Sequence, residues 1–283
     1  MRISVSMLSS YIYCKRKLFI EKVLGIKEEP KKATVKGSIR HKIFEIMSER
    51  EKGIIVSVTK EDTLYNIVKK YSSVFGEILR IVFEKYKYKL KAVEIRPLDL
   101  FKEIWPMFLE ESKERGKYLW DLIKEHRVYG AELLQKLPEA EPEYKIYSEK
   151  YNLIGIIDKI EFIDNNPVPI EFKTGKMPYD GVWPGHKIQL AAYSLLIEEK
   201  YEKRVNEGYV HYLDYKEKRR VVFNPFMKQE VIELINKVNL LMDSKEPPEM
   251  PKNTNKCVSC KLKHICKNNE IMDNELQKTL NIS

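Results

Sequence analysis

The chain has 283 residues, 43% of them hydrophobic, which is enough to bury a sizeable core in one large domain. Its formal net charge of +9 favours a polyanionic partner. No apolar run is long enough to span a bilayer and the start, MRISVS, lacks a signal-peptide pattern, so we expect a cytoplasmic protein without membrane association.

Charged residues make up 33% of the chain, while glutamine is scarce. Abundant lysine and glutamate with little glutamine is typical of heat-adapted proteins, so we expect an archaeal thermophile as the source. Helical spacing of apolar residues predicts a first helix over Met7–Leu24, with Cys14 inside it and the basic run Lys15–Lys17 on a solvated face. A polar linker, Glu28–Lys36, leads to a second helix that opens at Gly37.

Helical patterning dominates residues 60–137, with predicted helices at Glu61–Lys91, Leu98–Glu114 and Lys117–Leu137. Pro106 and Gly116 are expected to bend or break this pattern. The remaining elements are three further strands and one helix, predicted at Glu143–Lys150, Asn206–Tyr215, Lys218–Asn224 and Phe226–Ser244.

Two neighbouring strands, Asn152–Phe162 and Pro167–Gly175, form a predicted hairpin that is followed by a helix carrying Gln189. Asp158 and Glu171 fall near the ends of these adjacent strands. Glu171 and Lys173 are two residues apart and therefore project from the same face. Two carboxylates and a lysine can thus converge on one point.

Carboxylate oxygens in such an arrangement can hold one or two Mg²⁺ or Mn²⁺ ions, which polarise a phosphate and activate a water. Lys173 would orient that water or offset the developing charge. The alternative interpretation is a surface hairpin with alternating charges, because a Glu-x-Lys pair also occurs by chance in many strands.

The chain contains four cysteines: Cys14, and then Cys257, Cys260 and Cys266 close together near the other end. A disulfide framework is not expected in a cytoplasmic chain of this size. Three cysteines within ten residues indicate a metal-binding loop, and Cys14 can supply the fourth ligand if the first helix packs against the tail. Such thiolate sites hold zinc or an iron-sulfur cluster. His264 is an alternative member of the ligand set.

These patterns occur in a specific order along the chain: a lone cysteine, Gly37-x-x-x-His41, Asp158, Glu171-x-Lys173, Gln189-x-x-x-Tyr193 and a cysteine triplet. The nuclease motifs are similar to those of RecB-type nucleases in the PD-(D/E)xK superfamily. With the cysteines included, the order resembles the CRISPR-associated RecB-like iron-sulfur exonucleases, the Cas-four family.

The resemblance implies a mixed α/β, restriction-endonuclease-like RecB nuclease core whose central mixed sheet is flanked by helices. It implies metal ligation by His41, Asp158, Glu171 and the carbonyl of Phe172, with Lys173 positioning the water. Gln189 and Tyr193, one helical turn apart, would hold Lys173, the DNA backbone, or both. Glu45, one turn beyond His41, would support the histidine.

The resemblance further implies a [4Fe-4S] cluster on Cys14, Cys257, Cys260 and Cys266, although zinc stays open as an alternative. We expect a single nuclease domain over residues 1–283, a mostly helical insertion at 53–142, and a cluster module built from 1–25 with 251–268. The insertion would form a wall or arch beside the active site, carrying aromatic residues at Trp105, Tyr118, Trp120 and Tyr129.

The implied activity is exonucleolytic cleavage of single-stranded DNA with a 5′ to 3′ preference. Its setting would be CRISPR spacer acquisition and prespacer processing, with the integrase proteins as partners, and the oligomeric state is left open. A helicase-associated DNA repair nuclease of the same group is one alternative. A non-catalytic iron-sulfur DNA-binding scaffold is the other.

Overall fold

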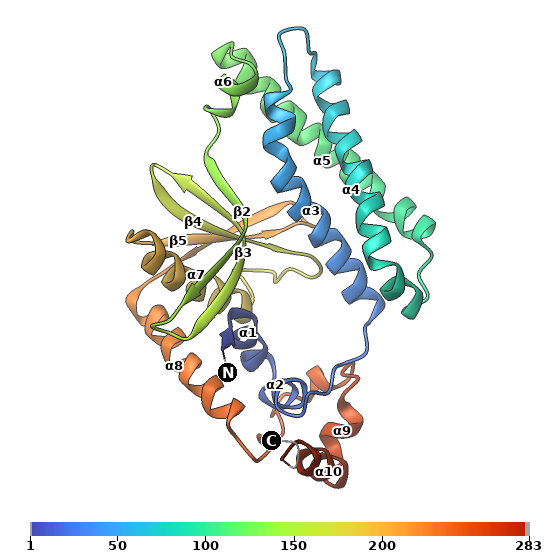
Figure 1. Ribbon diagram of the computed structural model, residues 1–283, viewed down its shortest axis with the longest axis vertical. Helices are drawn as coiled ribbons and strands as arrows, with labels where there is room; N and C mark the ends of the chain where they lie inside the picture. Colours follow the sequence, from blue (N-terminus) through green and yellow to red (C-terminus); the bar gives the residue numbers. More distant parts are fainter. Residues whose placement is uncertain (1, 281–283) are drawn as a thin grey trace.

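A six-stranded mixed sheet with helices on both faces forms the centre of the molecule, as the computed structural model of residues 2–280 shows (Figure 1). The strands are β1 (Ile3–Ser4), β2 (Glu139–Ser148), β3 (Leu153–Ile163), β4 (Asn166–Lys173), β5 (Glu207–Tyr212) and β6 (Glu217–Val222). The helices are α1 (Val5–Tyr13), α2 (Lys15–Lys22), α3 (Lys32–Val56), α4 (Leu64–Ala92), α5 (Pro97–His126), α6 (Gly130–Leu134), α7 (Pro184–Tyr201), α8 (Pro225–Met242), α9 (Lys263–Lys267) and α10 (Asn269–Leu280), with a 3₁₀ turn η1 at Thr254–Cys257. The predicted α/β fold with a mixed central sheet is confirmed. Met1 and residues 281–283, which the predicted domain bounds include, lie outside the described residues.

Strand β3 lies between β2 on one side and β1 and β4 on the other, and its two edges are used differently. Along one edge it pairs antiparallel with β2 over nearly its whole length. The other edge is shared: β1 pairs with Leu153 and Ile154, while β4 begins its antiparallel pairing at Lys159. Residues 155–158 therefore lie in a gap between the registers of β1 and β4. Strands β5 and β6 continue the sheet beyond β4, parallel and antiparallel respectively.

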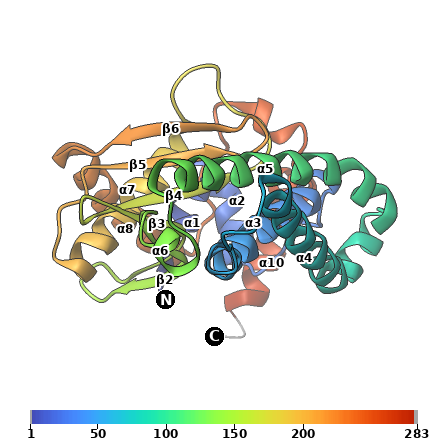
Figure 2. The same cartoon turned by 90° about the horizontal axis from the view of Figure 1, so that it is seen from above.

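The alternation of β4 divides the molecule into two cores. Ile170 and Phe172 are buried in a core formed with α3, α4 and α5. Glu171 and Lys173 point to the opposite face, where α1, α7 and α8 pack on the sheet in a second core. Seen from above, α5 lies across the helical layer (Figure 2). The gap in β3 lies between these two layers.

The helices α3, α4 and α5 form an elongated layer, and the helix breaks predicted at Pro106 and Gly116 do not occur. Pro106 lies inside α5, which is continuous from Pro97 to His126. Gly116 is also inside α5 and is buried against α4, where an added Cβ would lie 2.6 Å from Val68 Cγ2. The glycine therefore serves the close approach of two helices and does not end one.

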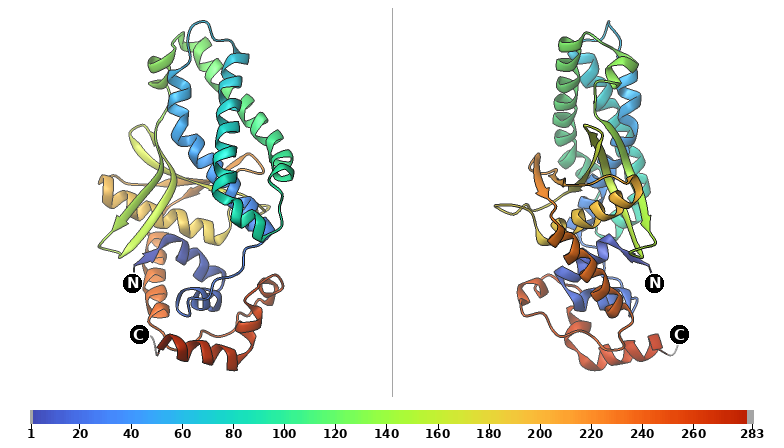
Figure 3. Two further views of the ribbon diagram at one scale, coloured as in Figure 1. Left: turned by 45° about the vertical axis from the view of Figure 1, so that its right-hand side comes forward. Right: turned by 90° about the vertical axis from the view of Figure 1, so that its left-hand side faces the viewer.

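The predicted single helix over Met7–Leu24 is two helices, because Cys14 has an extended backbone between α1 and α2 (φ −165°, ψ 108°). These helices contact α7, α8 and α9, so the two ends of the chain lie side by side at one pole of the molecule (Figure 3). Within residues 2–280, no helix combines the length and apolarity that crossing a membrane requires.

Candidate active site and cysteine cluster

His41 and Asp158 come together from two different layers. His41 lies on α3, and its Nε2 is 3.0 Å from Oδ1 of Asp158 on β3. The other carboxylate oxygen of Asp158 accepts a hydrogen bond of 2.7 Å from the backbone N–H of Phe172. The Asp158 side chain thus replaces a ladder hydrogen bond where β3 and β4 separate, which fixes the carboxylate in the gap.

Four further site residues form one hydrogen-bonded chain. Lys173 Nζ donates to Glu171 Oε1 at 2.6 Å and to Gln189 Oε1 at 2.9 Å. The amide nitrogen of Gln189 donates to Glu171 Oε1 at 2.7 Å and to the hydroxyl of Tyr193 at 2.8 Å. Tyr193 then donates to the carbonyl of Ile156 at 2.7 Å, within the unpaired edge of β3. Helix α7 therefore holds the ammonium group of Lys173 through the side chain of Gln189, whose amide oxygen and nitrogen are both hydrogen-bonded.

Two glycines allow these elements to approach. A Cβ on Gly37 would lie 2.8 Å from Thr174 Oγ1, directly after the catalytic candidate Lys173. A Cβ on Gly155 would lie 2.9 Å from the ring of Tyr193. The glycine of the Gly37-x-x-x-His41 motif thus leaves room for the Thr174 side chain at the end of β4, one helical turn before the histidine.

The electrostatics of the site reflect the burial of acidic groups. Burial and the nearby charge of Asp158 raise the pKa of Glu171 to about 7, although Lys173 opposes this shift. Burial would lower the pKa of His41, but its hydrogen bond to Asp158 and the charge of that residue outweigh burial and raise the pKa. The charge of Asp158 thus raises the pKa of both Glu171 and His41.

A pocket of about 400 Å³ opens over this gap, and its lining contains residues that sequence reasoning missed. Ser4, Val5 and Ser6 line it together with His41, Asp158, Glu171, Gln189 and Tyr193. The three N-terminal residues carry no chemical signal; only the pairing of β1 with β3 brings them here. Glu45, predicted to support His41, also lines the pocket and forms an ion pair with Lys42.

Two observations bear on whether His41, Asp158 and Glu171 can hold a metal ion. Among residues 2–280, no three His, Cys, Asp or Glu side chains are already arranged to hold a metal ion. In the gap of β3, the carboxylate of Asp158 is directed at His41 and that of Glu171 at Lys173. However, Glu171 Oε2 is buried and has no hydrogen-bond partner. An unsatisfied carboxylate oxygen beside a second carboxylate fits a divalent cation.

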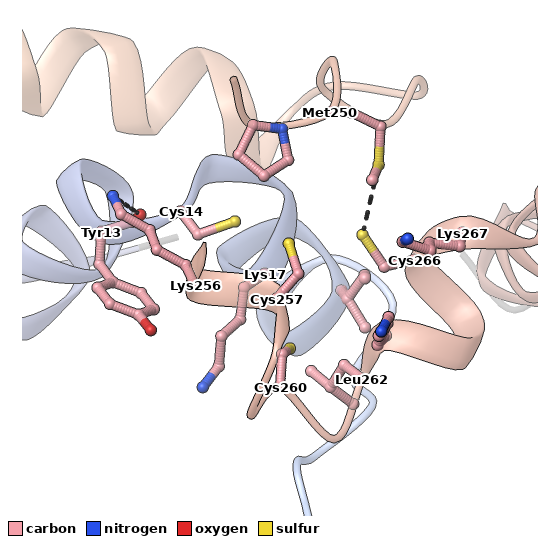
Figure 4. A pocket seen from close by; sticks show the side chains of 13 residues that line it. Tyr13, Cys14, Lys17, Met250, Lys256, Cys257, Cys260, Leu262, Cys266 and Lys267 are labelled. Carbon is pink, nitrogen blue, oxygen red and sulfur yellow. Dashed lines mark hydrogen bonds between the residues drawn. The ribbon is translucent and has the colours of Figure 1, made fainter. Parts of the chain in front are cut away.

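The four cysteines are brought together from both ends of the chain. Cys14, Cys257, Cys260 and Cys266 all line one small pocket, and their sulfur atoms face a shared space (Figure 4). Cys266 lies 3.7 Å, sulfur to sulfur, from Met250. Burial raises the pKa of the Cys266 thiol, while Arg16 opposes this shift. The set is made of soft thiols only, which is the donor chemistry of zinc or an iron-sulfur cluster.

Two predictions about the surroundings of the cysteines are wrong. Arg16, predicted on a solvated face, is only 7% exposed and donates hydrogen bonds to the carbonyls of Cys266 (3.2 Å) and Pro248 (2.6 Å). The sequence signal that could have indicated these contacts is the position of Arg16, two residues after Cys14. His264, the alternative ligand, is exposed and does not line the pocket; its Nδ1 lies 2.9 Å from the carbonyl of Lys261.

The sequence matches the PD-(D/E)XK nuclease superfamily over residues 2–267. The CRISPR-associated exonuclease Csa1 of Saccharolobus solfataricus is 26% identical over 282 residues, which covers 92% of this chain and 84% of that protein. A CRISPR-associated exonuclease Cas4/endonuclease Cas1 fusion of Leptospira interrogans is 26% identical over 158 residues, 51% of this chain and 29% of the fusion.

The DNA replication ATP-dependent helicase/nuclease dna2 of Schizosaccharomyces pombe is 26% identical over 277 residues, 93% of this chain. The chain spans only 29% of the fusion protein and 18% of the helicase/nuclease. Its own match to the superfamily, in contrast, extends over nearly all of its residues. The chain therefore belongs to the PD-(D/E)XK nuclease superfamily, as its motifs predicted, and is similar to the CRISPR-associated exonucleases within it.

Proposed function

We propose that the chain is a metal-dependent exonuclease that hydrolyses the phosphodiester bonds of single-stranded DNA with a 5′ to 3′ preference. The observation that carries this proposal is the position of Lys173. Its ammonium group is held by Glu171 and Gln189, and Glu171 also lines the pocket in which Asp158 pairs with His41. Acidic groups that can bind cations and a fixed ammonium group are the requirements for attack on a phosphodiester.

His41, Asp158 and Glu171 are the residues that would hold Mg²⁺ or Mn²⁺, with the carbonyl of Phe172 as a further ligand. A bound divalent ion would polarise the phosphate and lower the pKa of a water. The buried oxygen of Glu171 that lacks a partner supports this assignment.

Each remaining residue has a role that follows from its contacts. Lys173 donates hydrogen bonds and would orient the attacking water or a phosphate oxygen. Gln189 fixes the ammonium group, because both its oxygen and its nitrogen are engaged. Tyr193 positions Gln189 by bonding it to the backbone of β3. Such positioning is the main source of catalysis in phosphoryl chemistry.

For the cysteines we propose a [4Fe-4S] cluster with a structural role, bound by Cys14, Cys257, Cys260 and Cys266. Support comes from the shared pocket of the four thiols, whose candidate donors are all sulfur atoms. A tetrahedral zinc site would bring all four sulfur atoms to about 2.3 Å from one point. A cluster occupies a wider space.

The biological setting we propose is CRISPR spacer acquisition, in which the chain trims prespacers for the integrase proteins. Similarity to a protein that carries an exonuclease and an endonuclease on one chain supports an integrase partner. Similarity to a helicase/nuclease over 93% of this chain favours a second candidate, a repair nuclease that acts with a separate helicase. The two settings share the same site and differ in the partner.

The test of the nuclease is an assay of the purified chain with Mn²⁺ on a 5′-labelled single strand. We expect degradation by the wild type, and a loss of about 100-fold or more in Asp158→Ala and Lys173→Ala with single-strand affinity retained. Lys176→Ala, an exposed lysine in the next loop, is the matched control and should keep its activity. Unchanged activity in both site variants would reject the assignment, and binding without cleavage by the wild type would favour the scaffold alternative.

A further inference from the structure

The last two turns of α4 carry lysine and tyrosine residues that alternate in sequence and that the proposed nuclease site does not use. On the helix, Lys85 and Lys89 lie on one side and Lys87 and Lys91 on the other, because residues four apart are neighbours and residues two apart are not. Lys85, Lys87, Lys89 and Lys91 are exposed, and Tyr88 is 77% exposed. Leu90 is buried and anchors this turn to the helical core. Among residues 2–280, no acidic side chain forms an ion pair with Lys85, Lys89 or Lys91. We call Lys85–Lys91 the basic strip.

Tyrosine rings in the basic strip are already paired with cations. Lys89 Nζ lies 5.0 Å from the ring centroid of Tyr86, and Lys87 Nζ lies 5.4 Å from that of Tyr88. Basic residues interleaved with aromatic rings are typical of surfaces that bind single-stranded nucleic acid, because cations contact phosphates and rings stack on bases.

Tyr86 connects the basic strip to the catalytic residues. It lines a hollow of about 750 Å³, separate from the pocket over the gap, whose opposite wall includes Lys173 and Thr174 at the end of β4. His41 and Glu45 line both the hollow and the pocket, so the two spaces adjoin at the catalytic histidine. Trp105, Tyr118, Trp120 and Tyr129, the aromatics predicted beside the site, line neither space.

The wall of the hollow formed by α3 is also basic. Lys36 is ion-paired with Glu103 at 2.5 Å, and Arg40 with Asp214 at 2.7 Å. The lysine and arginine side chains that line the hollow, Lys36, Arg40, Lys42 and Lys173, outnumber its two glutamates, Glu45 and Glu103. This excess of positive charge favours phosphate groups passing from the basic strip toward Lys173.

We propose that the basic strip and this hollow form the track along which single-stranded DNA reaches the catalytic centre, with Tyr86 stacking on a base. This inference rests on the proposed function and assigns a role to the helical layer. The occupant is single-stranded, because the face of a base is open to an aromatic side chain only where the base is unpaired. Duplex DNA does not offer that face.

The first experiment measures the affinity of a fluorescent oligothymidine by anisotropy in Ca²⁺, with the variant Lys85→Ala/Lys89→Ala/Lys91→Ala. Loss of three phosphate contacts should weaken binding about 10- to 100-fold and reduce the slope of log Kd against log salt by about 2. Hydrolysis of thymidine 5′-p-nitrophenyl phosphate, which is too short to use the track, should be unchanged.

The matched control removes the same charge at the far end of the helical layer, in Lys60→Ala/Lys69→Ala/Lys117→Ala, and should leave affinity within about twofold of the wild type. Tyr86→Leu should lose about tenfold in affinity, whereas Tyr86→Phe, which keeps the ring, should not. Equal losses in both triple variants, no loss in the strip variant, or an equal loss for duplex DNA would overturn the track.

Failure of the track is distinguishable from failure of the nuclease. If the wild type cleaves single strands but the strip variants bind and cleave them normally, the track is wrong and the nuclease stands. If the wild type hydrolyses the small ester but neither binds nor cleaves DNA, the proposed substrate is wrong and the track falls with it. If the wild type binds DNA normally but hydrolyses neither substrate, the nuclease proposal is wrong and the track stands as a DNA-binding surface.

Discussion

At the scale of single residues, the site depends on a chain of side-chain hydrogen bonds that runs from Lys173 through Gln189 and Tyr193 to the backbone of β3. The sequence placed Glu171 and Lys173 on one face because a strand has a period of two, and Gln189 and Tyr193 on one face because four residues make one helical turn. It could not predict that His41 bonds to Asp158, because that contact depends on how α3 packs across the sheet. Ser4–Ser6 were missed for the same reason.

Removal of the Tyr193 hydroxyl tests how much this chain of hydrogen bonds contributes. Tyr193→Phe leaves one buried N–H of Gln189 and the partly buried carbonyl of Ile156 without their protein partner, so we expect a loss of about 1–3 kcal/mol in the free energy of unfolding and a lower kcat at unchanged DNA affinity. Urea unfolding and single-turnover kinetics measure the two effects.

Tyr209→Phe is the control for Tyr193→Phe. The Tyr209 hydroxyl donates to Glu207, which is partly exposed, so water can replace the lost hydrogen bond. It should cost less than about 0.5 kcal/mol. Equal costs for the two tyrosines would show that the Tyr193 hydroxyl has no special positioning role.

At the scale of elements, local pattern predicted the hairpin best. Strand β3 begins and ends within one residue of the predicted Asn152–Phe162, and β4 ends two residues before Gly175. The break at Cys14 was missed because neither glycine nor proline marks it; the extended backbone there is held by packing. Pro106 did not break α5, because tertiary contacts along this long helix outweigh the one hydrogen bond that proline removes.

Glycine substitutions in two long helices should have opposite effects. In Gly116→Ala the new Cβ would lie 3.2 Å from backbone atoms of Val68, so α4 and α5 must separate, and we expect a loss of about 1–3 kcal/mol in the free energy of unfolding. In Gly53→Ala the Cβ meets nothing within 4 Å, and α3 should gain about 0.5–1 kcal/mol. Stabilisation of both variants in urea melts would contradict close packing at Gly116.

At the scale of the whole molecule, the two ends of the chain are joined through the cysteine pocket. Lys256 Nζ bonds to the carbonyl of Tyr13 at 2.6 Å, and Arg16 to that of Cys266 at 3.2 Å. The spacing of the cysteine triplet predicted a binding loop, but only folding could show whether Cys14 reaches it. The assignment of 53–142 as an insertion and of 1–25 with 251–268 as a cluster module stays a prediction.

The cluster has an elemental test. Protein purified without oxygen should be brown, absorb broadly in the visible range and contain about four irons per chain. Cys14→Ser should lose most of the iron and lower the Tm, since the ends of the chain would lose their shared ligand. His264→Ala should keep the iron, because that side chain does not line the pocket. A colourless protein with one zinc per chain would replace the cluster with a zinc site.

The pairing of β1 with β3, and the packing of α1 and α2 on α7, α8 and α9, have a consequence for synthesis. A ribosome makes α1 and α2 well before α7, α8 and α9, the helices that cover their apolar residues. The apolar residues of α1 and α2 therefore stay exposed to solvent until α7, α8 and α9 are made. Nascent chains stalled before α7 should recruit chaperones, whereas released chains should not.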